Sequence, residues 1–252
     1  GLHYFEDIGE RGGPWHSGLV PGDKPITSKK CSAKVKVIEE NKLLSSREIT
    51  LEFEIPTDIA SDEQSRNKTT CPVKITTKLI LKNESPVLEF ETTVENTVKS
   101  HRLRVLFPSG IIHAKTAEAE GQFDVPSRPI LPIDPNDADL PGGDFFEGTK
   151  HAPVCTHPQL SFMDISDGKH GLAVINSGIC EYEVIDDKER TVALTLLRTY
   201  PKLKIMHTFL EAEDAQCLGS CTFRYALMPH VRGWEEADLH RYASLFNVPV
   251  KT

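Results

Sequence analysis

A strict alternation of apolar and polar side chains is the feature that most constrains the fold of this chain. Between residues 49 and 55, the apolar residues Ile49, Leu51, Phe53 and Ile55 alternate with polar ones. A period of two places the apolar residues on one face of a β-strand and the polar residues on the other. Strands with one dry and one wet face are typical of antiparallel sheets. We expect such strands at residues 33–37, 49–55, 73–81, 88–95, 103–107, 160–166, 171–176, 182–185, 192–197 and 222–228.

These strands predict an all-β fold of two packed antiparallel sheets. Residues 126–158 are rich in Pro, Asp and Gly and show no periodicity, which is typical of a long functional loop or a linker. Because similar strands flank this stretch, we interpret residues 1–252 as a single β-sandwich domain. One short C-terminal helix is expected, and its apolar face would carry Trp234, Leu239, Tyr242, Ala243 and Phe246.

The charge and cysteine content exclude several classes of protein. The net charge of −8 argues against a nucleic-acid partner, because no basic stripe could neutralise phosphates. No apolar run reaches membrane-spanning length, and the first residues lack the pattern of a signal peptide. The six cysteines are too sparse for a disulfide scaffold, so we expect reduced thiols and a cytoplasmic location. Cys217 and Cys221 could form a disulfide only if their loop is tight, and the sequence leaves this open.

The opening run from His3 to Pro21, HYFEDIGERGGPWHSGLVP, combines acids, glycines and an aromatic ring. Glycines at this density predict a sharp backbone turn. Carboxylates accept hydrogen bonds from hydroxyls and a flat ring covers the C–H face of a sugar, so Asp7, Glu10 and Trp15 are candidates for a carbohydrate site. The alternative is a glycine-rich surface loop with solvated acids.

Other groups of polar residues are weaker candidates for a functional site. Asp164 and Asp167 lie where a strand ends in a turn, and we favour turn capping over catalysis for both. Arg102 and Arg104 alternate with core residues, so we expect outward ion pairs of little energetic worth. Zinc would need a second pair of ligands, and calcium would need a central glycine and a closing glutamate. The residues considered for zinc are His151, Cys155 and His157, and those for calcium are Asp134, Asn136, Asp137 and Asp139.

Several long blocks, in the same order, resemble one protein family. They are HYFEDIGERGGPWH at the start, ENTVKSHRLRVLFPSG at 95–110, GQFDVPSRPI at 121–130, HPQLSFMDISDGKHGLAVINSGICEYEV at 157–184, ALTLLR at 193–198 and FRYALMPH at 223–230. The chain resembles the C-terminal β-domain of glycoside hydrolase family 38, the α-mannosidases. It is most similar to the bacterial members, which include mannosylglycerate hydrolases. The resemblance implies a large galactose-mutarotase-like supersandwich.

The resemblance also implies that the chemistry lies elsewhere. The nucleophilic Asp of the family and its zinc belong to an N-terminal barrel, and no part of this chain matches that barrel. We therefore expect a fragment of a longer enzyme of mannose metabolism, with no catalytic residue, metal or cofactor of its own. Its partners would be the N-terminal domains of the enzyme and an α-mannoside or other carbohydrate. A homo-oligomer is left open, as is contact between the 126–158 loop and the barrel.

The family brings the glycine turn near the sugar pocket, so the resemblance implies substrate-binding roles for Trp15, with Asp7 and His16 as neighbours. Glu10 and Gly13 stand where the family usually has Asp, and Trp15 stands where Tyr is usual. Tryptophan removes the phenolic hydroxyl but enlarges the stacking face.

Two other functions remain open on the sequence. The chain could be a non-catalytic carbohydrate-binding, structural or oligomerisation module. It could also be a mutarotase-like enzyme acting alone, which would need a histidine and a carboxylate converging in a groove. The candidate histidines by type are His101, His113, His151, His157, His170 and His207.

Overall fold

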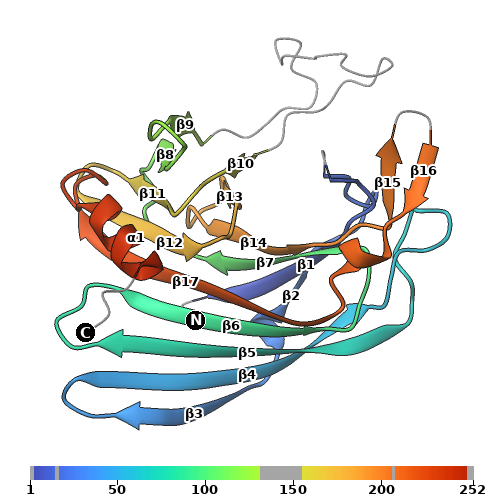
Figure 1. Cartoon of the computed structure of the whole chain (residues 1–252), viewed down its shortest axis with the longest axis horizontal. Helices are drawn as coiled ribbons and strands as arrows, with labels where there is room; N and C mark the ends of the chain where they lie inside the picture. Colours follow the sequence, from blue (N-terminus) through green and yellow to red (C-terminus); the bar gives the residue numbers. More distant parts are fainter. Residues whose placement is uncertain (1–2, 15–16, 131–154, 206–207, 249–252) are drawn as a thin grey trace.

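The computed structural model describes residues 3–14, 17–130, 155–205 and 208–248. Two large antiparallel sheets account for most of this chain, which confirms the all-β prediction (Figure 1). The smaller sheet has the strand order β10-β13-β14-β7-β1-β2. Its strands are β1 (Tyr4–Gly9), β2 (Ile26–Thr27), β7 (His101–Phe107), β10 (Thr156–Pro158), β13 (Glu181–Val184) and β14 (Val192–Arg198).

The larger sheet has nine strands in the order β3-β4-β5-β6-β17-β12-β11-β8-β9. Every pairing in both sheets is antiparallel. A separate hairpin joins β15 (Lys202–Ile205) to β16 (Thr208–Glu211). The strands of the larger sheet are β3 (Ala33–Glu40), β4 (Leu44–Pro56), β5 (Thr70–Lys82), β6 (Leu88–Asn96), β8 (Thr116–Ala119), β9 (Ser127–Pro129), β11 (Phe162–Ser166), β12 (His170–Ser177) and β17 (Gly219–Val231).

The apolar faces of the two sheets meet in the main core. Phe90 of β6, Phe107 of β7 and Tyr225 of β17 pack ring against ring at its centre, with Phe90 and Tyr225 stacked at 5.3 Å. The Tyr225 hydroxyl is also within 2.6 Å of Thr92 Oγ1, so its buried polar end has a partner. The alternation in the sequence therefore identified the inner face of both sheets.

Helix α1 (Leu239–Asn247) covers the outer face of the larger sheet. Its buried residues are Leu239, Ala243 and Phe246, as expected from the sequence, whereas Tyr242 is only partly buried and Trp234 precedes the helix. The three buried residues form a second core with Phe162 of β11 and Met228 of β17. Two 3-10 turns, Ser28–Lys30 and Glu213–Gln216, complete the regular structure of the described chain.

The first strand of the larger sheet departs from the prediction. We expected the apolar side chains of 33–37 to lie on a dry face, yet all eight residues of β3 are exposed. Val35 is 65% exposed and Val37 55%. The smaller sheet does not extend far enough to cover this edge, because its outermost strand on that side is β2, which is only two residues long.

The ends of the 126–158 stretch form the short strands β9 and β10, although no periodicity marked them. Residues 131–154 lie outside the described residues. All six cysteines are described and none forms a disulfide, Cys217 and Cys221 included. Within the described chain, no helix is both long and apolar enough to cross a membrane.

Candidate functional site

The opening run is only partly the turn that we expected. Tyr4–Gly9 is strand β1, paired along its length with β7, and the turn begins at Glu10. Residues 10–19, called the glycine loop below, return to the start through a bridge between Glu10 and Leu19. Asp7 therefore lies in the sheet, beneath the glycine loop rather than on it.

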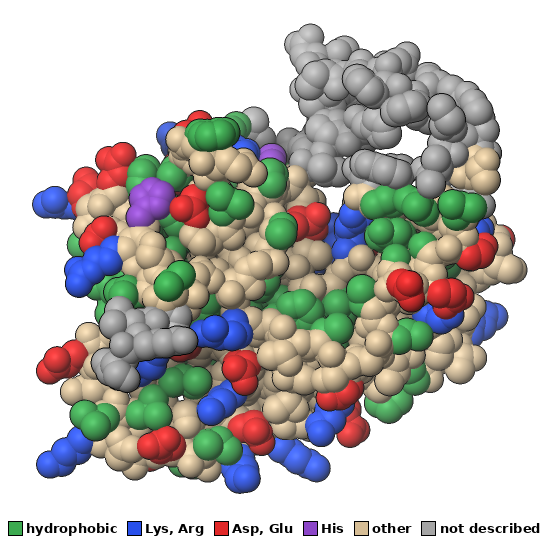
Figure 2. All heavy atoms as spheres, in the orientation of Figure 1, with side chains coloured by type: hydrophobic (Ala, Val, Ile, Leu, Met, Phe, Trp, Pro, Cys, Tyr) green, Lys and Arg blue, Asp and Glu red, His purple; other side chains and the backbone are tan. Residues whose placement is uncertain are grey.

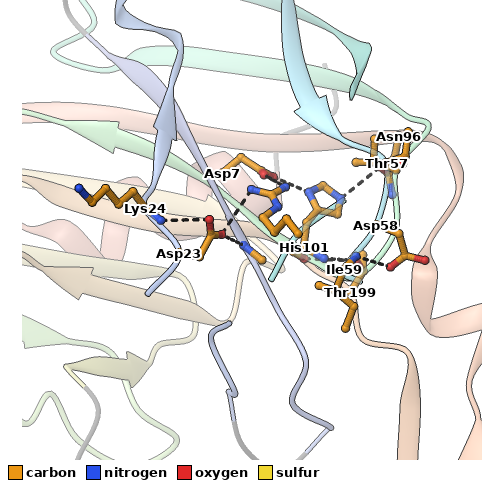
Figure 3. Close-up of polar contacts among 12 residues, drawn as sticks. Asp7, Asp23, Lys24, Thr57, Asp58, Ile59, Asn96, His101 and Thr199 are labelled. Carbon is orange, nitrogen blue, oxygen red and sulfur yellow. Dashed lines mark hydrogen bonds and ion pairs between the residues drawn. The ribbon is translucent and has the colours of Figure 1, made fainter. Parts of the chain in front are cut away.

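Asp7 is fully buried, and both of its carboxylate oxygens are occupied. Arg66, from the segment between β4 and β5, donates to Oδ1 at 2.5 Å. His101, the first residue of β7, approaches Oδ2 through Nδ1, also at 2.5 Å (Figure 3). The side chain of Arg66 is 5% exposed and that of His101 is not exposed at all. A buried carboxylate needs such partners, because losing water without them costs several kcal/mol.

The orientation of the His101 ring is set by Asn96 at the end of β6. The Asn96 amide nitrogen donates to the carbonyl oxygens of Gln216 and Cys217, so its oxygen must face the ring. That oxygen lies 3.2 Å from His101 Nε2 (Figure 3). Both ring nitrogens thus face side-chain oxygen atoms, one of Asp7 and one of Asn96.

Asp23 connects this cluster to the far end of the glycine loop. Its Oδ2 accepts from the backbone N–H of Gly9 at 2.8 Å and lies 3.7 Å from Arg66 Nη1. A Cβ atom on Gly9 would lie 2.8 Å from Val20 and 3.0 Å from the Arg66 side chain, so glycine permits the close approach. We call Asp7, Asp23, Arg66, Asn96 and His101 the Asp7 cluster.

Glu10 holds the glycine loop together from inside. Its carboxylate is fully buried and accepts from the backbone N–H groups of Gly12 at 2.7 Å and Gly18 at 2.6 Å, and from Ser17 Oγ at 2.7 Å. Arg198 of β14 donates to the carbonyl oxygens of Gly13 and Pro14 at 2.8 and 3.1 Å. Hydrogen bonds to charged groups are about twice as strong as neutral ones, so Glu10 and Arg198 hold the described residues of this loop firmly.

Trp15 and His16, the other candidate substrate-binding residues, lie outside the described residues. Both immediate neighbours of this pair are described: the Pro14 carbonyl is held by Arg198 and the Ser17 hydroxyl by Glu10. The chain is therefore anchored on each side of Trp15 and His16, at Pro14 to β14 and at Ser17 to Glu10.

Arg104 forms outward ion pairs as expected, but the expectation that Arg102 and Arg104 lie in solvent was wrong, because each is only 6% exposed. Arg104 donates to Glu6 at 2.6 Å and also pairs with Glu183, both across the smaller sheet. Burial, followed by the charge of Arg104, lowers the pKa of Arg102, and Glu183 and two other acids offset part of this effect. Figure 2 shows acidic and basic side chains together in the hollow below the grey segment.

A second histidine–carboxylate pair lies on the outer face of the larger sheet. His230 Nε2 is 2.8 Å from Asp164 Oδ1, and the two side chains are 4% and 1% exposed. The ring lies across Gly171, where a Cβ atom would be 2.1 Å from His230 Cε1. His230 also lines an open groove with Met228, Tyr242 and Pro86. Asp164 is thus a buried ion-pair partner, whereas Asp167 caps its turn as expected by accepting from the N–H groups of Lys169 and His170.

A mutarotase-like site would need a histidine and a carboxylate open to a groove. The pair of His101 and Asp7 is fully buried, so it does not meet that requirement. Of the other candidate histidines, His151 and His207 lie outside the described residues. Among the residues that are described, no group of three or more His, Cys, Asp or Glu side chains could hold a metal ion. His151, one of the residues considered for zinc, lies outside the described part of this chain. Every residue considered for calcium lies outside it.

Comparison with known proteins decides the family. Residues 1–202 match the family described as "Glycosyl hydrolases family 38 C-terminal domain". The chain belongs to this family. The family 38 domain is 28% identical to the alpha-mannosidase from Enterococcus faecalis V583, with a TM-score of 0.83 over 96% of this chain and 27% of that one. A second family 38 structure from Enterococcus faecalis gives 28% identity and a TM-score of 0.81.

A curated relative extends the comparison. The family 38 domain is 26% identical over 267 residues to a "Putative mannosylglycerate hydrolase" from Halalkalibacterium halodurans, covering 99% of this chain and 27% of the relative. The chain thus spans about a quarter of the length of the relatives it matches.

Sequence reasoning missed most of the partners in this site. Arg66 and Asn96 carried no local signal, since each is a single polar residue in a polar stretch. Glu10 was noticed as one acid among three, but nothing in the sequence showed that its carboxylate would turn inward onto the loop. His101 was one of six histidines chosen by type alone.

Proposed function

We propose that this family 38 domain is the C-terminal part of an α-mannosidase-type glycoside hydrolase that hydrolyses α-mannosides. In the longer protein it packs against an N-terminal barrel that carries the nucleophile and the zinc. The observation that carries the proposal is the family match over residues 1–202, together with the likeness to an alpha-mannosidase at a TM-score of 0.83. The share of the relatives covered, 27%, leaves room for a separate catalytic unit.

Within that enzyme, the glycine loop contributes to the sugar site. Trp15 supplies a stacking surface, and His16 lies beside it with hydrogen-bonding nitrogens. Asp7 acts as a positioning residue, since both of its oxygens are bonded within the protein. The support is the stiffness of the loop: Glu10 binds three donors inside it and Arg198 two carbonyls. Anchoring of the chain on both sides of a binding residue lowers the entropy cost of binding there.

The loop is tested in the longer enzyme with an aryl α-mannoside. Trp15→Ala is expected to raise KM about tenfold or more, in line with the loss of one aromatic contact, whereas Trp15→Tyr retains most of the affinity. Glu10→Gln is also expected to raise KM, because the hydrogen bonds that Glu10 accepts inside the loop become weaker without its negative charge. The matched control is Glu52→Gln, an exposed acid on β4. Unchanged kinetics in both loop variants would favour a purely structural module.

The placement of the chemistry is tested separately. The 252-residue chain with added zinc is expected to give no turnover of an aryl α-mannoside. Steady turnover that survives removal of contaminating enzyme contradicts this proposal and favours an enzyme acting alone.

A further inference from the structure

The two sheets end in four edge strands, and one of them differs from the rest. Three edges are short: β2 has two residues, and β9 and β10 have three each. The fourth edge, β3, runs for eight residues and is exposed throughout. Its outer side presents a row of backbone N–H and C=O groups with no neighbouring strand in the described chain. Proteins usually keep such edges short or covered, because a long open edge is a template for another strand.

The face of β3 that looks toward the core is apolar and uncovered. Directly opposite residues share a face, and one row runs from Val94 and Ile75 in the core through Leu51 to Ala33 at the edge. Leu51 still packs against the core. Beyond it, Val35 is 65% exposed and Val37 is 55% exposed. The apolar core thus continues past the smaller sheet to the open edge, where nothing described covers it (Figure 1).

The charges of β3 are separated along the strand. Its first half carries Lys34 and Lys36, and its last two residues are Glu39 and Glu40. A second copy of the same strand, placed antiparallel, sets the basic half of each against the acidic half of the other. A parallel copy would set like charges together, which is destabilising. Lysines usually protect an edge from pairing, but here an antiparallel copy supplies acids that match them.

We propose that β3 is a self-association surface, along which two copies of this chain pair antiparallel across a two-fold axis. The backbone groups of the two edges form the ladder about an axis at Val37, next to the bulge that precedes Glu39, so that Val37 of each copy covers Val37 of the other and Lys36 faces Glu39. The charges select the antiparallel orientation. Such an interface is isologous, with the same patch used by both copies, as in most soluble dimers. This surface is separate from the glycine loop, so the proposal does not depend on the proposed catalytic role.

The test uses charge reversal and complementation. One variant carries Lys34→Glu with Lys36→Glu, and the other carries Glu39→Lys with Glu40→Lys. We expect the unmodified chain to dimerise in a concentration series followed by light scattering. Each variant alone should weaken the dimer about tenfold or more, because opposite-charge pairs become like-charge pairs. An equimolar mixture of the two should re-associate as a heterodimer, which native mass spectrometry distinguishes by mass.

A control variant and a second measurement test the proposal further. A matched control, Lys169→Glu with Lys188→Glu, reverses two exposed lysines in turns away from β3 and should leave the dimer intact. Hydrogen exchange of the β3 amides should slow as the concentration of the unmodified chain rises. Three results would each overturn the proposal: the unmodified chain stays monomeric, both charge reversals leave the dimer unchanged, or the two variants do not associate when mixed. So would a longer enzyme whose oligomeric state is unchanged by the same reversals, since another domain would then cover β3.

Discussion

Arg66 follows Asp7 by fifty-nine residues in the sequence, yet its guanidinium donates to the Asp7 carboxylate at 2.5 Å inside the protein. This contact joins the segment between β4 and β5, in the larger sheet, to β1 in the smaller sheet. His101 on β7 completes the pairing from the other side of the carboxylate. The Asp7 cluster thus ties the two layers together.

The first prediction concerns that ion pair. Asp7→Asn is expected to lower the free energy of unfolding by about 3–5 kcal/mol, because Arg66 and His101 are left buried without their anion. The double variant with Arg66→Met should cost less than the sum of the two single variants, since the lone charge is also removed. Urea denaturation of the four proteins measures this coupling. Strict additivity would show that the two side chains do not depend on one another.

The second prediction concerns the packing of the glycine loop. A Cβ atom on Gly18 would lie 2.9 Å from the backbone of Gly12, which cannot move aside without breaking the loop. Gly18→Ala is therefore expected to cost about 1–3 kcal/mol of stability. Gly13→Ala is the matched control, because its added methyl group meets only a carbonyl at 3.7 Å. Thermal unfolding compares the two, and equal losses would contradict a specific close approach at Gly18.

The third prediction concerns the pH dependence of the His230 pair. Burial acts to lower the pKa of His230, but the hydrogen bond and charge of Asp164 outweigh it, and the pKa is raised. A histidine whose pKa is raised by folding stabilises the protein fully below its unfolded value of about 6.5, and this contribution is lost as the pH rises through the folded value.

The variants His230→Asn and Gly171→Ala should both lack that loss of stability above neutral pH. The first removes the titrating ring, and the second forces the ring away from Asp164 although the histidine is retained. The free energy of unfolding, measured at several pH values around neutrality, gives the slope of stability against pH for each protein. A slope in Gly171→Ala equal to that of the unmodified chain would argue against the role of this glycine.

The fourth prediction concerns His3, whose ring packs edge-on against Phe5 and Phe90. Burial lowers the pKa of His3 to about 4. The unfolded chain takes up this proton near pH 6.5 but the folded chain resists it, so stability falls between these values as the pH drops. The free energy of unfolding falls by about 3 kcal/mol in total, since each unit of pKa difference corresponds to about 1.4 kcal/mol. His3→Phe should keep the ring packing and remove that loss, which acid titration of stability would reveal.

The strands were predictable because burial on one face leaves a local pattern. The alternation at 49–55 and 88–95 corresponds to β4 and β6, and the apolar face of the late helix corresponds to α1. The short strands β2, β8, β9, β10, β15 and β16 were not predicted, because so few residues rarely show a clear period. Strand β1 was also missed, since its residues were interpreted as part of the glycine-rich turn. The same pattern misled us at β3, since alternation shows that a face is apolar but not that another layer reaches it.

Charged residues show the limit of sequence reasoning most clearly. Arg102 and Arg104 alternate with core residues, which normally indicates a wet face, yet both are buried in the outer side of the smaller sheet. Asp7 and Glu10 looked alike as acids near glycines. In the structure, Asp7 is an ion-pair partner within the sheet, whereas Glu10 accepts hydrogen bonds from backbone N–H groups inside the glycine loop.

The sequence by itself determined that this chain forms antiparallel sheets with a helix near the end, and its blocks determined the family. Only the tertiary structure decided which acids meet which bases and which strand stays open. The reason is physical. A periodic apolar face follows from residues that are neighbours in the sequence, whereas an ion pair or a covered edge depends on residues that are far apart in the sequence and meet only in the fold.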